Sequence, residues 1–259
     1  MGSNVLDVEL VILILSLGVV AALYSSVGHG GGSGYLAILS LSAFAMNDPG
    51  WLKQHAWSLN LIVAAISFYH FHSLGHHRSA LTVPFVLASV PMAFIGGYLA
   101  VTGNAYDLLL SLILILAAMR LFTSKSEDYD TSIRPPSWKV ILPWGAGIGL
   151  ISGVVGIGGG ILLSPLLMLR GWATPKMAAA TSAAFIWVNS AAGLIGSASV
   201  NGILLDSELI ILAIPMVIIG GLFGSKLGSA SANQSIVRKI LVAVLLLAAV
   251  KRLMDLVGF

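Results

Sequence analysis

The chain has 259 residues, of which 58% are hydrophobic and 9% are charged, and its mean hydropathy is +0.98. A soluble domain carries about 25% charged residues, so this composition predicts an all-α protein that crosses the membrane several times. The formal net charge of +3 is small and the basic residues are scattered, which excludes a nucleic-acid-binding surface, while the lack of cysteine excludes disulfides and thiolate metal sites.

Ten apolar segments follow one another along the chain. They cover residues 8–26, 34–46, 56–71, 80–101, 108–122, 140–155, 161–169, 178–198, 209–223 and 237–250. Most are long enough to cross a hydrocarbon core of about 30 Å, but the second and the seventh are short. The most polar stretch, 123–139, separates the fifth segment from the sixth and predicts an aqueous connecting loop.

Three motifs occur twice in the same order. The sequence VGHGGG (27–32) recurs as VGIGGG (155–160), PMAFIGG (91–97) as PMVIIGG (215–221), and LAAMRL (116–121) as LAAVKRL (247–253). Such an ordered set indicates an internal duplication. We therefore predict that residues 1–122 form a first membrane repeat, that 123–139 connect the halves, and that 140–259 form a second repeat.

The Lys and Arg residues indicate how the repeats are oriented. If the short segments cross the membrane, only Lys53, Lys251 and Arg252 lie on one side and the other basic residues lie opposite, whereas re-entrant short segments give a nearly even division. Basic residues concentrate in cytoplasmic loops, which favours the crossing arrangement. Each half then crosses an odd number of times. We expect inverted repeats in the cell (inner) membrane, with both termini outside the cytoplasm.

Each triple glycine interrupts an apolar region, which lipid-facing helices do not tolerate unless the exposed backbone faces protein, water or a ligand. A helix that starts after glycine presents free N–H groups and a positive dipole end, which suit an anion. Paired interruptions in two halves indicate a transporter's binding site. Lys and Arg stand only at the ends of the apolar segments, so the expected anion ligands are the backbone amides around Gly30, Gly31, Gly32, Gly156, Gly158, Gly159 and Gly160.

The alternative interpretation of the glycines is structural. Small residues spaced four apart allow membrane helices to approach each other closely, without any ligand. The residues with this spacing are Gly28, Gly32, Gly156, Gly160, Gly220 and Gly224. Close packing is the favoured interpretation for the last two.

Several side chains can complete an oxyanion site. Uncharged donors near the starts or middles of apolar segments are Ser33, Ser58, Asn60, Thr181, Ser182 and Asn189. The alternative for such side chains is a hydrogen bond to a helix carbonyl or to a neighbouring helix. His29 can donate to an anion or carry a proton, or else cap a helix or bind water.

A second group of histidines follows the third apolar segment. His70, His72, His76 and His77 stand among aromatic residues and next to Arg78. No cysteine or carboxylate lies nearby in the sequence, so these side chains predict an aromatic and basic boundary at the membrane surface rather than a metal site.

The sequence GVVGIGGGILLSP (153–165), followed by Ala180, Thr181 and Ser182, resembles the TauE/SafE family of membrane transport proteins. The resemblance covers nearly the whole chain and implies export of sulfite or of organosulfonates such as sulfoacetate. The first half departs from the pattern. There His29 replaces Ile157, Ala37 replaces Pro165, and Trp57-Ser58 stands where the second half has Thr181-Ser182.

These observations predict an alternating-access transporter for small sulfur oxyanions, with the substrate near the membrane midplane. We expect no catalytic residues, no metal and no cofactor. The expected partners are a small anionic substrate and the lipid bilayer, without nucleic acid, and a homodimer is left open. No Asp or Glu lies inside an apolar segment, so voltage rather than a carboxylate relay is expected to drive export.

Two alternatives use the same sequence features. An intramembrane serine protease would use Ser33 in its Gly-Gly-Ser-Gly turn, with His70 as the base. A passive anion channel would use the same scaffold, with fluxes that do not saturate and no counter-transport.

Overall fold

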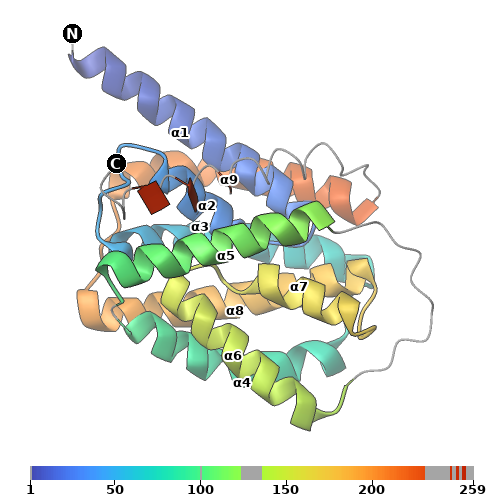
Figure 1. Ribbon diagram of the computed structural model, residues 1–259. Coiled ribbons are helices and arrows are strands. Elements are labelled where there is room, and N and C mark those ends of the chain that lie inside the picture. The colour runs from blue at the N-terminus through green and yellow to red at the C-terminus, as the bar shows by residue number, and fades with distance from the viewer. Residues whose placement is uncertain are drawn as a thin grey trace.

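The computed structural model describes residues 2–99, 101–123, 136–230, 246, 249–250 and 253–254, without the side chains of 2–7, 117 and 120–123, and every element in it is helical (Figure 1). The predicted all-α class is confirmed. In chain order the elements are α1 (Gly2–Ser25), α2 (Gly32–Ser40), α3 (Pro49–Ser73), α4 (Ser79–Tyr98), α5 (Gly103–Thr123), α6 (Trp138–Val155), α7 (Gly160–Leu169), α8 (Pro175–Asn201) and α9 (Ser207–Ala230). Most of the predicted connecting loop and of the tenth apolar segment lies outside the described residues.

Five helices are long and apolar enough to cross a membrane, namely α4, α6, α8, α9 and the Val8–Ser25 part of α1. The prediction of a multi-pass membrane protein is confirmed. Helices α2 and α7 have only 9 and 10 residues. At 1.5 Å per residue, each covers roughly half of a 30 Å hydrocarbon core.

The second apolar segment is less helical than its hydropathy suggests. Helix α2 stops at Ser40, and turns follow up to Asn47. The Ser42 hydroxyl donates to the Leu39 carbonyl and accepts from the Phe44 amide (2.8 and 3.2 Å). These local hydrogen bonds compete with helix continuation.

Helices α3 and α8, which follow the half-length helices of the two halves, both begin with an N-cap residue followed by proline. Asp48 accepts a hydrogen bond from the Gly50 amide (2.6 Å) and is followed by Pro49 at the start of α3. Thr174 accepts one from the Met177 amide (3.3 Å), and proline follows it at the start of α8. An N-cap followed by proline fixes a helix start. Helix α3 therefore begins seven residues before the predicted apolar segment and includes Lys53.

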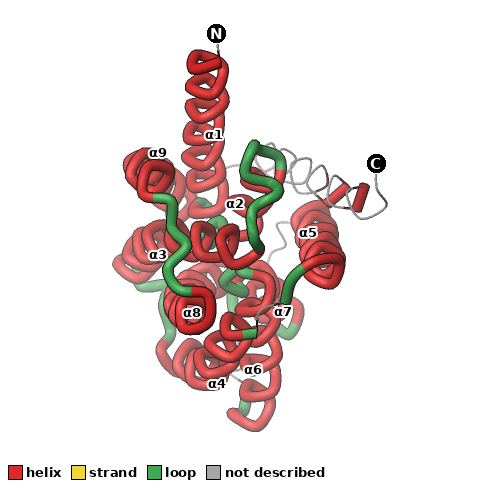
Figure 2. The backbone as a smooth tube through the Cα atoms, turned by 90° about the vertical axis from the view of Figure 1, so that its left-hand side faces the viewer, coloured by secondary structure: helices red, strands yellow, loops and turns green. Residues whose placement is uncertain are grey.

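Helices α1 and α9 lie side by side, as do α4 and α6 (Figure 2). Both pairs join the two halves through small residues, which are Gly220, Gly224 and Gly228 on α9 and Gly145, Gly149 and Gly153 on α6. A Cβ atom on any of these would meet backbone or Cβ atoms of the facing helix or, for Gly228, of Ser26 just after α1. The packing interpretation of Gly220 and Gly224 is confirmed. Helix α1, the first of the first half, thus packs on α9, and α6, the first of the second half, packs on α4. Helices α9 and α4 carry the two copies of the PM…GG motif.

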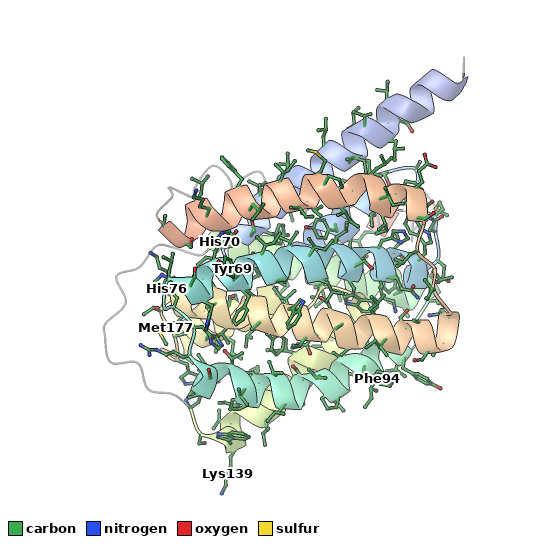
Figure 3. All side chains as sticks on the ribbon, turned by 180° about the vertical axis from the view of Figure 1, so that it is seen from behind. Tyr69, His70, His76, Phe94, Lys139 and Met177 are labelled. Carbon is green, nitrogen blue, oxygen red and sulfur yellow. The ribbon has the colours of Figure 1, made fainter. Side chains whose placement is uncertain are left out.

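Helices α3 and α8 pack side by side and run in opposite directions. Gln54, near the start of α3, donates to the Gly202 carbonyl just after α8 (2.9 Å). Figure 3 shows His70, His76 and Met177 at one end of the bundle and Phe94 at the other. The start of α3 therefore lies at the end opposite to the histidines. The inverted orientation of the repeats across the membrane stays a prediction.

Two large groups of buried apolar side chains form most of the core, and Phe71, Ala179 and Ala180 form a small third group. The first large group is built mainly from α1, α2, α3, α5 and α9, and the second from α4, α6, α7 and α8. Val155, Ile157 and Ile161 come from the second half but belong to the first group. The second glycine motif thus reaches into the core of the first half.

Candidate functional site

Two non-helical breaks interrupt the chain at the glycine motifs. The first separates α1 from α2 and holds Gly28 and Gly31 at φ +74° and +106°. The second separates α6 from α7, where Gly156, Gly158 and Gly159 have φ +94°, +75° and +83°. Residues with a side chain rarely adopt this left-handed region, so glycine is required at these positions. The predicted breaks at both motifs are confirmed.

The two breaks contact each other. A Cβ atom added to Gly32 would lie 2.8 Å from the carbonyl oxygen of Ile157, and one added to Gly160 would lie 3.2 Å from Cδ2 of His29. The first residue of each half-length helix therefore touches the break of the other half. The first N–H groups of a helix have no intrahelical partner and carry partial positive charge, so two such ends at one place favour an anion.

Asn60 of α3 lies at this crossing. Its Oδ1 is 2.6 Å from the Cβ position of Gly30, and its Nδ2 is 2.5 Å and 2.9 Å from those of Gly32 and Gly158. The side chain is fully buried, and neither amide atom has a hydrogen-bond partner. A buried polar group without a partner costs about 1–3 kcal/mol, so an unpaired amide here calls for a ligand or water.

Helix α8 supplies further unpaired polar groups. Ser190 places its hydroxyl 3.1 Å from the Cβ position of Gly158, and this buried hydroxyl has no hydrogen-bond partner. The amide of Asn189 is likewise buried and unpaired. Asn189 was predicted from the sequence, whereas Ser190 was missed, because its only signal was its position next to Asn189.

His29 lies in the first break and connects it to the second half. Its Nδ1 donates to the Val27 carbonyl (2.9 Å), because a carbonyl only accepts, and in the neutral ring Nε2 then accepts from the Ser164 hydroxyl (3.3 Å). Ser164 in turn is 2.7 Å from the Ser182 hydroxyl. A chain of polar hydrogens thus runs from α8 through α7 to the first break.

The remaining predicted donors have protein partners. Ser33 is bonded to the Tyr24 hydroxyl (2.9 Å), and Ser58 donates to the Gln54 carbonyl of its own helix (2.8 Å). Thr181 accepts from the Thr82 hydroxyl (3.3 Å). Of the six uncharged side chains, the structure leaves only Asn60 and Asn189 without a hydrogen bond.

Ser33 and His70, the two residues that a serine protease would use, do not contact each other. Ser33 is bonded to Tyr24, while His70 Nδ1 is bonded to the Ser225 hydroxyl of α9 (2.7 Å). A serine nucleophile needs a base within hydrogen-bond reach. His70 stands near the end of α3 and is occupied elsewhere.

The other histidines form aromatic contacts at the same end of the bundle. The rings of His72 and His77 lie 5.3 Å apart, and His77 also meets the Phe68 ring edge-on at 5.0 Å. Burial and the positive charge of Lys176 lower the pKa of His76, and burial and His72 lower that of His77. In the part of the chain that the structure describes, no group of three or more His, Asp or Glu side chains is placed to hold a metal.

Lys53 is the main residue near this site that sequence reasoning missed. Helix α3 begins at Pro49, so Lys53 falls in its second turn, and its side chain is only 1% exposed. Its Cγ lies 2.6 Å from the Cβ position of Gly156 in the second break. Lys53 lies outside the predicted apolar segment 56–71, but the helix begins earlier than that segment and carries the lysine into the interior. The Asp48-Pro49 pair was the signal that could have located the helix start.

Membrane-length helices combined with two half-length helices that meet at their broken ends are typical of membrane transporters. The comparison with known proteins agrees with this class. The family model "Sulfite exporter TauE/SafE" matches residues 12–252. The chain belongs to the TauE/SafE family of membrane transporters.

One curated relative supports the same assignment. The chain is 34% identical over 254 residues to a protein of Sinorhizobium fredii (strain NBRC 101917 / NGR234) named "Probable membrane transporter protein y4hK", covering 96% of this chain and 100% of the relative. No solved structure matches the chain.

Proposed function

We propose that this protein exports small sulfur oxyanions, such as sulfite or an organosulfonate, through a site at the crossing of its two glycine breaks. The observation that carries this proposal is Asn60, a fully buried and unpaired amide that touches glycines of both breaks. The family model is named for sulfite export, which supports the choice of substrate class.

The proposed site holds the anion with neutral donors. The N–H groups that begin α2 and α7 point their partial positive charge toward the crossing, and the Asn60 Nδ2 group adds a side-chain donor. Ser190 supplies a further unpaired hydroxyl beside Gly158. Sulfite and sulfonates present three oxygen acceptors in a small volume, which several converging donors can satisfy together.

Transport follows from this position. An anion held where the two halves meet is exposed to one side or the other when the halves move relative to each other, as alternating access requires. In the proposed orientation, both termini lie outside the cytoplasm of an inner-membrane protein. An inside-negative potential then favours outward movement of an anion, with a free-energy change of about 2.3 kcal/mol per charge per 100 mV.

Efflux of radiolabelled sulfite from proteoliposomes tests the proposal. Wild-type efflux is expected to saturate, to show counter-transport and to accelerate with an inside-negative potential. N60L removes both the donor and the acceptor of the side-chain amide and is expected to abolish the saturable component. S199A is the control, because Ser199 is exposed and donates only to the Ile195 carbonyl of its own helix.

The outcomes separate the candidate functions. Saturable efflux by a folded N60L protein with wild-type kinetics would exclude a site at Asn60. Flux that does not saturate and shows no counter-transport would instead identify a passive channel.

A further inference from the structure

The ammonium group of Lys53 is buried against aromatic rings rather than against a carboxylate. Its Nζ lies 6.0 Å from the centroid of the Trp57 ring and 5.8 Å from that of the Tyr106 ring. All three side chains are at most 1% exposed. Cation–π contacts offset only a small part of the cost of removing an ammonium group from water.

The acidic residue that acts on Lys53 electrostatically is Asp48. The Asp48 carboxylate accepts a hydrogen bond from the Gly50 amide (2.6 Å) and caps α3. No described carboxylate forms an ion pair with Lys53 within 4.0 Å. Buried charges in membrane proteins are normally paired or serve function, so this ammonium group lacks a counter-ion that an anion would supply.

Lys53 is aligned with the central site along one face of α3. Trp57 and Asn60 follow it by four and seven residues, which places the three side chains on one stripe of the helix. Seven residues correspond to about 10 Å along the axis. The lysine also lies against Gly156, where any side chain would collide with its Cγ and Cβ atoms.

We propose that Lys53 is a second anion-binding position, between the central site at Asn60 and the end of the bundle opposite to the histidines. Its ligand is the small, negatively charged oxyanion that the protein transports, so the inference rests on the proposed function. Trp57 and Tyr106 cover the Lys53 ammonium group in the present conformation. When an anion enters or leaves the central site, it takes the place of these two rings next to the ammonium group.

Isothermal titration of the purified protein with sulfite tests this position. K53M is expected to raise the Kd for sulfite tenfold or more. The matched control is K139M, which removes the same charge from an exposed position at the histidine end (Figure 3) and is expected to leave the Kd within twofold. Without anion, K53M should unfold at the same temperature as wild type or higher, because it removes an unpaired buried charge.

The absence of cysteine from the sequence allows a chemical rescue. K53C contains a single thiol, and alkylation with 2-bromoethylamine, with complete modification of this buried position verified by mass spectrometry, forms a thioether that carries an ammonium group at nearly the length of lysine. Aminoethylated K53C is expected to bind sulfite within threefold of wild type. K53C treated with iodoacetamide, which adds a neutral group, is expected to bind as weakly as K53M.

Each outcome decides the matter. Wild-type affinity in K53M, or an equal loss in K139M, overturns the role of Lys53 while leaving the proposed function intact. A K53M protein that unfolds at a lower temperature, together with no rescue of K53C by aminoethylation, shows that the lysine is structural and also overturns it. Failure of the wild type to bind sulfite, sulfate or sulfoacetate overturns the proposed function itself.

Discussion

Gly32 tests how closely the two glycine breaks approach each other. It is the first residue of α2 and does not have a positive φ, so alanine adds a methyl group there without backbone strain. That methyl carbon would lie 2.8 Å from the Ile157 carbonyl oxygen and 2.5 Å from Asn60 Nδ2, whereas ordinary contacts begin at 3.4 Å. The breaks must therefore separate by roughly half an ångström in a closely packed interior.

The expected magnitude follows from this collision. Overpacking of a well-packed site costs about 1–3 kcal/mol. If this cost falls on the anion-bound arrangement, G32A raises the Kd for sulfite about 5- to 150-fold, because 1.4 kcal/mol corresponds to a factor of ten. Isothermal titration with sulfite measures the Kd, and size-exclusion chromatography shows whether the variant is folded.

Gly147 of α6 provides the matched control. It is exposed, and a Cβ atom there would meet nothing within 4 Å. G147A is expected to leave sulfite binding unchanged and to stabilise the helix slightly, because alanine has the higher helix propensity. A folded G32A protein that binds sulfite as tightly as the wild type would refute the placement of the site between the breaks.

Two further predictions concern packing and pH. G224L should lower the thermal midpoint of unfolding markedly, because the new side chain collides with the Ala22 backbone. G221A is the control and should leave the midpoint nearly unchanged, because the nearest neighbour of its Cβ atom lies at 3.4 Å. Equal midpoints for the two variants would contradict the close contact of α1 and α9. The pKa of His76 is lowered by burial and by Lys176, so the folded protein binds fewer protons than the unfolded chain just below pH 6.5. The contribution of His76 to stability is therefore complete above that pH and is lost as the pH falls. H76Q should flatten the decline of the thermal midpoint of unfolding between pH 7 and 5. An unchanged decline in H76Q would contradict this role of His76.

The helices and their breaks could be predicted because their signals are local. Hydropathy located the described helices, and the glycine motifs located both breaks, since glycine is needed where φ is positive. The same reasoning identified Asn60 as a candidate donor. Only the structure shows that its amide meets glycines of both halves and has no partner.

The hydrogen-bond partners could not be predicted, because they belong to neighbouring helices whose packing the sequence does not give. Ser33 is paired with Tyr24 of the preceding helix, and Ser182 with Ser164, so these hydroxyls are less available than their positions suggested. Lys53 was missed for a different reason. Hydropathy assigns a charged residue to a loop, whereas the N-cap and proline before it start the helix earlier and carry the lysine into the interior.

Anomalous diffraction from crystals grown with selenite, the selenium analogue of sulfite, locates the bound anion. We expect a selenium peak at the crossing of the breaks, within hydrogen-bond distance of Asn60 and the first amides of α2 and α7. A peak elsewhere would contradict this placement, for example in the apolar cavity of about 500 Å³ that residues of α1, α2 and the turns after α2 line. So would an empty crossing under conditions in which the protein binds selenite in solution.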